Sequence, residues 1–133
     1  MGTIRGAFAF SRKHHLLKRS EFTACYDTGQ RYFSSHFVLF VLASAEGTPW
    51  RLGLAVTRKS GNAVWRNRIK RLVREFFRLH QDLLPAAPSA VDIVVVPKRT
   101  LDPRQLTLAR LTREFLPVVR AWRQESAAQQ PVF

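Results

Sequence analysis

The sequence predicts a single small α+β domain with the element order α-β-β-α-β-α, in which helices pack against a mixed sheet. Its 133 residues are enough for one domain with a modest core. Three short apolar runs have the length and composition of strands, and one longer segment has the periodicity of an amphipathic helix. Apolar residues make up 46% of the chain, which excludes a wholly disordered basic tail.

The amino-terminal part is expected to be an arm followed by a short helix. Residues 1–15 show little periodicity and predict a flexible or docked arm, on which His14 and His15 are solvated. The helix that follows is expected to have Ser20 as its N-cap and Gly29 just past its end. Its apolar side, at spacings of three and four residues, would carry Phe22, Cys25 and Tyr26.

Two strands are expected next. Residues 36–43 are rich in β-branched and aromatic side chains, which is typical of a buried strand. Turn-forming residues at 46–49 predict a hairpin into a second strand over 51–59. This second strand alternates, with Leu52, Leu54 and Val56 on one face and Gly53, Ala55 and Thr57 on the other. The small-residue face could form the floor of a ligand site, but close packing of a helix is the favoured interpretation.

The segment from Asn62 to His80 predicts the long helix, with Asn62 as its N-cap. A projection at 100° per residue gives a buried stripe with Phe77 and His80 at its edge. The stripe consists of Trp65, Ile69, Leu72, Val73 and Phe76. An adjoining polar arc, with Arg68 and Glu75 beyond it, contains Arg66, Asn67, Lys70, Arg71, Arg74 and Arg78.

This arc has the chemistry of a phosphate-binding surface. The chain carries a net charge of +13, and so basic a domain usually neutralises nucleic-acid phosphates. Arg66, Lys70 and Arg74 are spaced four residues apart and repel one another, which a bound polyanion would relieve. Arginine suits bidentate phosphate contacts, and the helix amino terminus, with Lys59 upstream, adds further donors. The alternative is a basic face that is merely solvated.

The carboxy-terminal third predicts a strand and a helix. A linker containing Pro85 and Pro88 leads to a buried strand over 91–96. Asp102 and Pro103 are typical of a helix start, and the helix is expected to run to about Leu116. Pro117 should kink or interrupt it before Trp122. The domain is therefore assigned to residues 16–123, with a frayed tail over 124–133.

Several other classes of protein are not expected. A single Cys25 excludes an internal disulfide and a multi-cysteine zinc site, and the chain lacks an apolar run of membrane-spanning length. A cytoplasmic protein without a membrane partner is predicted. The nine acidic residues are scattered, whereas metal-dependent phosphodiester hydrolysis needs clustered carboxylates. No catalytic residue and no metal ligand are therefore assigned to the chain itself.

The segment TRKSGNAVWRNRIKRLVREFFR closely resembles the signature region of the bacterial ribonuclease P protein family. Its hallmark reads Arg66, Asn67, Arg68, Ile69, Lys70, Arg71 and then Arg74. The resemblance continues through LLKRSEF, HFVLFV, RLGLAV and DIVVVPK, and covers roughly residues 14–120.

The resemblance implies an RNA-binding subunit that assists a catalytic RNA in removing the 5′ leader from precursor tRNA. It implies one protein per RNA, Mg²⁺ held mainly by the RNA, and a left-handed β-α-β crossover. The catalytic RNA would contact Lys59, Asn62, Arg66, Asn67, Arg68, Lys70, Arg71 and Arg74. A cleft for the single-stranded leader would be lined by Phe22, Tyr26 and Phe40, with Lys59, Lys70 or Arg74 at its edge. Spacing alone would make Phe22 and Tyr26 ordinary core aromatics.

Two other functions remain open on composition alone. A structural RNA-binding protein, such as a ribosomal protein or an RNA chaperone, would be equally basic and would have no role in tRNA processing. A DNA-binding module is the third possibility, although the chain shows no helix-turn-helix spacing and no dimer seam.

Overall fold

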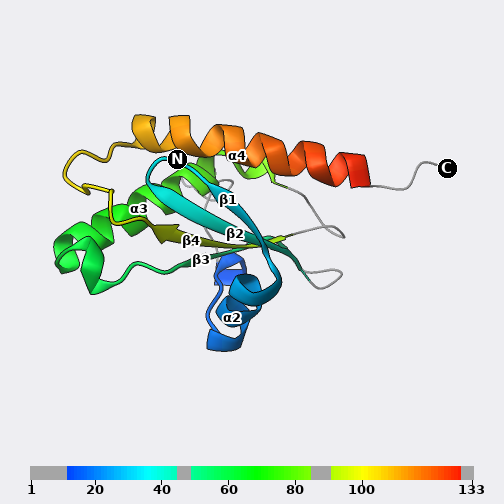
Figure 1. Ribbon diagram of the computed structural model, residues 1–133, viewed down its shortest axis with the longest axis horizontal. Helices are drawn as coiled ribbons and strands as arrows, with labels where there is room; N and C mark the ends of the chain where they lie inside the picture. The colour runs from blue at the N-terminus through cyan, green and yellow to red at the C-terminus, as the bar shows by residue number, and fades with distance from the viewer. Residues whose placement is uncertain (1–11, 45–48, 85–90, 130–133) are drawn as a thin grey trace, which may run out of the picture.

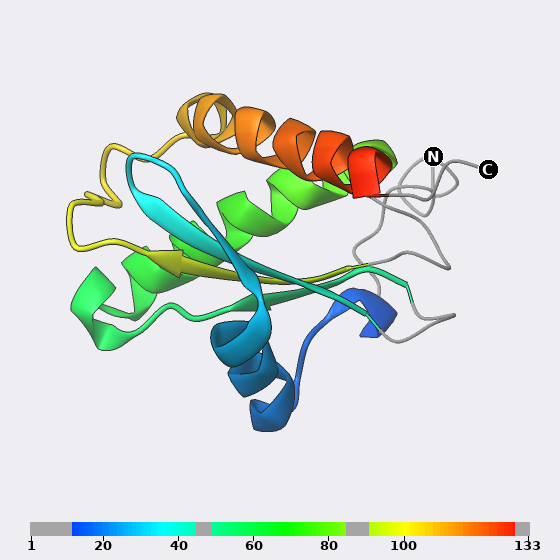
Figure 2. The same ribbon diagram turned by 45° about the vertical axis from the view of Figure 1, so that its right-hand side comes forward.

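The computed structural model describes residues 12–44, 49–84 and 91–129, with side chains as far as Trp122. One four-stranded sheet separates two layers of helices (Figures 1 and 2). Helices α3 (Ala63–Leu79) and α4 (Leu108–Gln129) cover one face, and α2 (Arg19–Thr28) lies against the other. The predicted α+β class is confirmed.

The sheet is mixed and has the strand order β1-β2-β4-β3. The strands are β1 (Gln30–Phe33), β2 (Phe37–Ala43), β3 (Arg51–Leu54) and β4 (Val91–Pro97). Strand β2 is antiparallel to both β1 and β4, whereas β3 is parallel to β4. The expected hairpin between β2 and β3 is therefore wrong, because β4 lies between them. The run of buried valines in β4 suits the centre of a sheet, where both faces are covered.

Strand β1 was not predicted, so the order becomes α-β-β-β-α-β-α. It begins with Gln30 and Arg31, so its four residues lack the long apolar run that marks β2 and β4. The strand forms because a tight turn, closed by the Ser34 N–H on the Phe37 carbonyl at 2.9 Å, folds it back onto β2. The handedness of the β3-α3-β4 crossover stays a prediction.

Two helix boundaries differ from the expected ones. Helix α2 begins at Arg19 rather than after Ser20, and the Glu21 carboxylate accepts the Lys18 N–H at 3.1 Å. Its end at Gly29 is confirmed. Helix α4 begins at Leu108, because the Asp102 carboxylate closes a separate turn on the Arg104 N–H at 3.0 Å.

Pro117 does not interrupt α4, so the expected end of the helix near Leu116 is wrong, whereas the alternative expectation of a kink stays a prediction. The helix continues through it to Gln129, so the backbone expected to fray from residue 124 is helical to that point. Proline lacks the N–H that would bond the carbonyl four residues earlier. Both Pro117 and Arg113 are exposed, so water can satisfy the carbonyl that the proline leaves unpaired.

Strand β3 ends at Leu54 rather than at Lys59, and Arg58–Ser60 form a 3-10 turn instead. The alternation from Leu52 to Val56 is confirmed and divides the molecule into two cores. Leu52 packs into the larger core beneath α3 and α4, together with Leu54 and Val56. On the opposite face Ala55 joins the smaller core, which contains Leu16, Cys25 and Val94. Phe22 of α2 lies so close over Gly53 that a Cβ there would be 2.7 Å from its ring. At Gly53 the small residue therefore serves close helix packing.

The segment before α2 is docked along the free edge of β3. His15 forms a parallel bridge with Leu52, and the Leu16 N–H bonds the Leu52 carbonyl at 3.0 Å. His14 is buried, with its ring stacked on Trp50 at 4.1 Å, so the expectation that it is solvated was wrong. The stacking removes one face of the imidazole from water. Residues 1–11 of the predicted arm lie outside the described residues.

Substituting Gly53 tests whether close packing places α2. Gly53→Ala should lower the free energy of unfolding by roughly 1 kcal/mol, because overpacking costs about 1–3 kcal/mol. Alanine loses less conformational entropy than glycine on folding, but in a strand this stabilises by only about 0.5–1 kcal/mol. Denaturant titration measures the change. In a Phe22→Ala background the opposing ring is absent and only the Leu16 Cβ remains within 3.2 Å, so the same substitution should cost clearly less. An equal loss in both backgrounds would contradict this packing.

Candidate nucleic-acid interface

Helix α3 presents the basic face, and its amino terminus is built as expected. Gly61 has φ of +126°, a conformation that favours glycine, and it turns the chain out of a short 3-10 turn. The Asn62 side chain then accepts the Trp65 N–H at 3.1 Å, which confirms it as the N-cap. The remaining unpaired N–H groups give this end of α3 a positive partial charge.

The apolar stripe of α3 fixes the direction of the basic face. The fully buried members are Ile69, Val73, Phe76 and Phe77. Phe77 lies inside the core rather than at the edge of the stripe, with its ring 5.1 Å from Phe76 and 6.0 Å from Phe115. Helix α4 covers the side of α3 that carries Phe77, so the buried stripe of α3 is wider than the projection indicated.

Four cations of α3 form neither an ion pair nor a side-chain hydrogen bond in the described part of the chain: Arg66, Lys70, Arg71 and Arg74. Arg71 and Arg74 are exposed, and Arg66 and Lys70 are half-buried. Asn67, between them on the helix, is also exposed. The Nε atom of Arg66 is buried, so this guanidinium is held against the protein surface. Together these side chains form a surface that attracts an anion.

Two arginines of the same helix are already engaged within the protein. Arg78 donates to the Glu75 carboxylate at 2.9 Å, and this hydrogen bond holds the pKa of Glu75 below its usual value. Arg68 donates to the Leu106 carbonyl at 2.8 Å and so ties α3 to the segment that precedes α4. The sequence pattern did not separate these two from the unpaired cations. A contact between Arg68 and RNA stays a prediction.

A hollow between α2, β3 and α3 brings predicted residues together. It has a volume of about 150 Å³ and places Phe22 in the same lining as Lys70 and Arg74. The other lining residues are His15, Leu16, Leu17, Leu52 and Leu54. An aromatic ring from one side therefore shares a cavity with two cations from α3, which is the combination expected of the cleft.

Tyr26 and Phe40 form a second aromatic group on the same face of the sheet. Their rings meet edge to face at 5.0 Å, and Tyr26 keeps 38% of its surface exposed. Burial raises the pKa of the Tyr26 hydroxyl, so it remains a hydrogen-bond donor at neutral pH. Lys59 lies apart from this pair, in a second hollow that it shares with Ala55 and Val96.

A charged cluster that the sequence did not reveal holds α2 on the sheet. Arg51 of β3 donates to Asp92 of β4 through Nε at 2.9 Å and through Nη2 at 2.8 Å, and it also pairs with Glu21 of α2. Burial would raise the pKa of Glu21, but the Lys18 N–H and the Arg51 guanidinium outweigh it and lower that pKa. The sequence offered one sign of this cluster: Asp92 is the only charged residue in an apolar strand, and a buried carboxylate needs a partner.

Two features of the described residues bear on catalysis: the Cys25 thiol and the spacing of side chains that can bind metal ions. Burial raises the pKa of the Cys25 thiol to about 11, so the thiolate is scarce at neutral pH. In the described ranges no three His, Cys, Asp or Glu side chains are grouped so that they could hold a metal ion. None of the helices in that part of the chain combines the length and apolar character needed to cross a bilayer.

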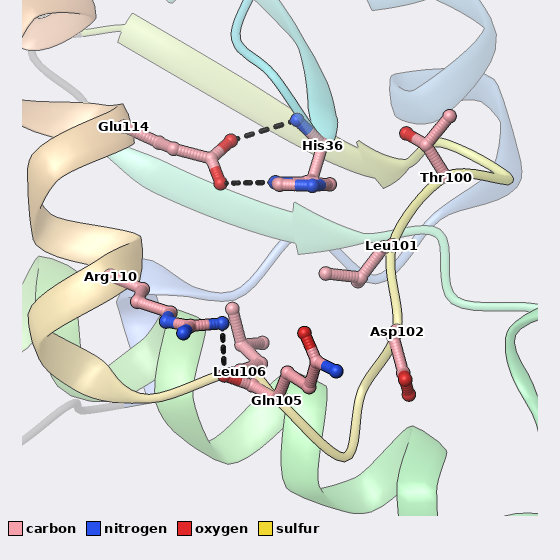
Figure 3. A pocket seen from close by; sticks show the side chains of 8 residues that line it. All are labelled: His36, Thr100, Leu101, Asp102, Gln105, Leu106, Arg110 and Glu114. Atoms are coloured by element: carbon pink, nitrogen blue, oxygen red, sulfur yellow. Dashed lines mark hydrogen bonds and ion pairs between the residues drawn. The ribbon is translucent and has the colours of Figure 1, made fainter.

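A separate pocket of about 120 Å³ lies between α4 and the loop before it (Figure 3). Glu114 accepts hydrogen bonds there from the His36 N–H at 2.8 Å and from the Ser34 hydroxyl at 2.7 Å. Its other oxygen lies 2.6 Å from His36 Nδ1. Burial would raise the pKa of Glu114, but these partners lower it. The cluster joins α4 to the turn between β1 and β2.

Comparison with known proteins gives consistent matches. The family model for ribonuclease P matches residues 10–123. The ribonuclease P protein component of Oleidesulfovibrio alaskensis is 53% identical over 111 residues, covering 83% of this chain and 86% of its own length. That of Maridesulfovibrio salexigens is 44% identical over 112 residues, covering 84% and 88%.

Solved structures agree in fold. The RNase P protein of Staphylococcus aureus superposes with a TM-score of 0.70 at 29% identity, covering 81% of this chain and 94% of its own. The RNase P protein of Thermotoga maritima gives a TM-score of 0.68 at 29% identity, with coverage of 80% and 96%.

The Glu114 cluster predicts a pH-dependent stability. Because its pKa is lowered in the folded protein, Glu114 stabilises the fold above its ordinary pKa of 4.5, and this contribution is lost as pH falls through the folded value. Glu114→Gln should therefore reduce the free energy of unfolding at pH 7 by about 1.5 kcal/mol. The difference from the natural chain should shrink below pH 4.5 in denaturant titrations.

The matched control is Glu75→Gln, which removes a more exposed carboxylate paired only with Arg78 in the described structure. Its effect at pH 7 should be smaller, because exposed ion pairs contribute little. A Glu114→Gln deficit that stayed constant between pH 7 and pH 3 would rule out this explanation.

Proposed function

The chain belongs to the ribonuclease P protein family, and we propose that it serves that enzyme by holding two RNAs on two adjoining surfaces that share Lys59, Lys70 and Arg74. It is a protein subunit of the ribonuclease P holoenzyme and acts in tRNA processing. In the proposal, the basic face of α3 binds the catalytic RNA. The sheet face beneath and beside α2 binds the 5′ leader of precursor tRNA. The observation that carries it is the group of unpaired cations on α3, which lies next to a cleft lined by Phe22.

The α3 surface suits a folded RNA backbone. Arg66 and Arg71 can each present several donors to phosphate oxygens, and Asn62 marks a helix terminus that favours anions. The proposed set of RNA-binding residues is completed by Asn67, Arg68, Lys70, Arg74 and Lys59. Binding to phosphates would also relieve the repulsion among cations four residues apart.

The cleft suits a single strand. Exposed aromatic rings let bases stack regardless of sequence, and nearby cations follow the backbone. Both the rings and the cations lie on one side of the sheet. The rings are Tyr26, Phe40 and Phe22, and the cations beside Phe22 are Lys70 and Arg74. Lys59 would meet the strand further along. This division explains how one small domain could contact enzyme and substrate RNA together.

Catalysis is assigned to the RNA subunit in this proposal, with one protein per RNA. Mg²⁺ is a hard cation that prefers oxygen ligands, which RNA phosphates supply in quantity. The protein's own contribution near the cleft is positive charge, which repels metal ions and stabilises phosphates instead. We place the complex in the cytoplasm, where its precursor tRNA is made. A ribosomal or RNA-chaperone role is not favoured, since the relatives are ribonuclease P protein components.

Reconstitution tests the function directly. The chain, mixed with the catalytic RNA of its own organism, should allow leader removal from precursor tRNA at a magnesium concentration where the RNA alone is slow. The reason is that protein cations replace part of the phosphate neutralisation that Mg²⁺ otherwise provides. Gel analysis of the 5′ product measures the rate. Protein alone should release no leader; cleavage by RNA-free protein would overturn the assignment of catalysis.

The two surfaces should separate by mutation. Arg66→Ala with Arg71→Ala should weaken binding to the catalytic RNA. The plot of log K against log salt concentration should become shallower, its negative slope losing about 0.7–0.9 in magnitude for each phosphate that the variant no longer neutralises. Tyr26→Ala should instead weaken precursor binding by the assembled holoenzyme, because a stacking ring is removed. Filter binding across a salt series measures the first effect, and substrate titration measures the second.

Arg113→Ala with Arg120→Ala is the matched charge control, since it removes two exposed cations from α4. It should leave the affinity for catalytic RNA nearly unchanged. If the α3 pair and Tyr26→Ala damaged assembly and precursor binding to the same extent, the two-surface proposal would fail.

A further inference from the structure

The face of the sheet that carries α2 is only partly covered by it. The register places Arg31, Phe40, Val94 and Gly53 in one row across the four strands. Helix α2 covers this row: Tyr26 packs on Phe40 and Phe22 lies over Gly53. The next row, away from α2, consists of Phe33, Val38, Val96 and Ala55.

This second row is more open and mostly apolar. Val38, Val96 and Ala55 are each half-buried, whereas Val94 in the covered row is fully buried. Strands lie about 4.8 Å apart, so the row extends roughly 14 Å from β3 to β1. It continues the surface of the Tyr26–Phe40 pair towards the outer edge of the sheet, where Phe33 lies.

Phe33 ends the row as an exposed aromatic ring with a fixed cation beside it. The ring is 63% exposed on the edge strand β1. The Lys98 ammonium lies 5.5 Å from its centroid, and the Ser34 carbonyl accepts a hydrogen bond from that ammonium at 2.6 Å. A mostly exposed phenylalanine adds little to the core. Because the ammonium lies over one face of the ring, a flat π-system would stack on the opposite face.

The surroundings of the row carry positive charge. Lys59, Lys98 and Arg99 line a hollow of about 280 Å³ together with Val96 and Ala55 at the β3 end of the row. No acidic residue is among the residues that line it. At the other end Arg31 is exposed two positions before Phe33, on the same face of β1. An apolar floor between cations matches the bases and phosphates of a single-stranded RNA.

We propose that Phe33 and Lys98 form a further stacking site for the precursor tRNA leader, occupied by a nucleotide that lies beyond Tyr26 and Phe40. The inference rests on the proposed leader-binding function and deepens it. A leader that crosses the open row would place its phosphates near the cations of the hollow and one base on the Phe33 ring. The site would make affinity depend on leader length as well as on the nucleotides nearest the cleavage point.

The test uses the reconstituted holoenzyme and precursor tRNAs whose leaders are shortened one nucleotide at a time. Affinity of the natural protein should rise in a step when the leader becomes long enough to reach β1. Phe33→Ala should remove this step, with a loss of about five-fold or more for long leaders, the lower end of base–aromatic stacking. Phe33→Trp should retain the step because it keeps a stacking ring. Because Phe33 is exposed, its replacement should leave the fold intact. Thermal unfolding of each variant checks that a loss of affinity does not come from misfolding.

The outcomes distinguish this site from the function on which it rests. If the natural protein responds to leader length and Tyr26→Ala weakens binding, while Phe33→Ala matches the natural protein at every length, the Phe33 site is refuted and the leader function stands. If neither leader length nor Tyr26→Ala matters, the leader function itself fails. A Phe33→Ala protein that binds all leaders normally but loses self-association in sedimentation would assign the ring to pairing between edge strands, and would also overturn the proposal.

Discussion

The arrangement of the protein depends on strand β4 being buried on both faces. Ile93 and Val95 point into the core beneath α3 and α4, whereas Val94 lies in the smaller core under α2. A strand that is apolar on both sides must sit in the interior of a sheet with a layer of structure on each face. The basic helix and the aromatic cleft therefore form on opposite layers, and both reach solvent along the β3 edge, where Lys70 and Arg74 of α3 share a hollow with Phe22 of α2.

Asp92 is the exception within this strand, and it explains how α2 is positioned. A carboxylate in a buried strand needs partners, because an unpaired buried charge is costly. Arg51 supplies two hydrogen bonds to it and at the same time pairs with Glu21 of α2. One guanidinium thus connects two strands and a helix. The aromatic residues of α2 are held over Gly53 and Phe40 by this pairing and by close packing, so the cleft is shaped before any RNA arrives.

Sequence patterns predicted the elements with strong local signals. The α3 segment has a clear apolar stripe and the Asn62 cap, and residues 36–43 and 91–96 are dense in strand-forming side chains. Sheet order could not be predicted, because a local hairpin is the default for neighbouring strands and nothing local indicates that β4 inserts between them. The basic face was predictable from periodicity. The engagement of Arg68 by the Leu106 carbonyl was not, because it depends on a segment 38 residues away.

The balance of energies on α3 explains why the protein can be folded before it binds. Repulsion between like charges four residues apart costs about 0.2–0.5 kcal/mol per pair on an exposed helix. Burial of one large apolar side chain stabilises by about 1.5–3 kcal/mol, and Ile69, Val73, Phe76 and Phe77 are all fully buried. The core therefore outweighs the repulsion several times over. Because the helix that carries the cations is already formed, the proposed RNA binding would not carry the ordering cost of this helix, and the relief of repulsion would add to affinity.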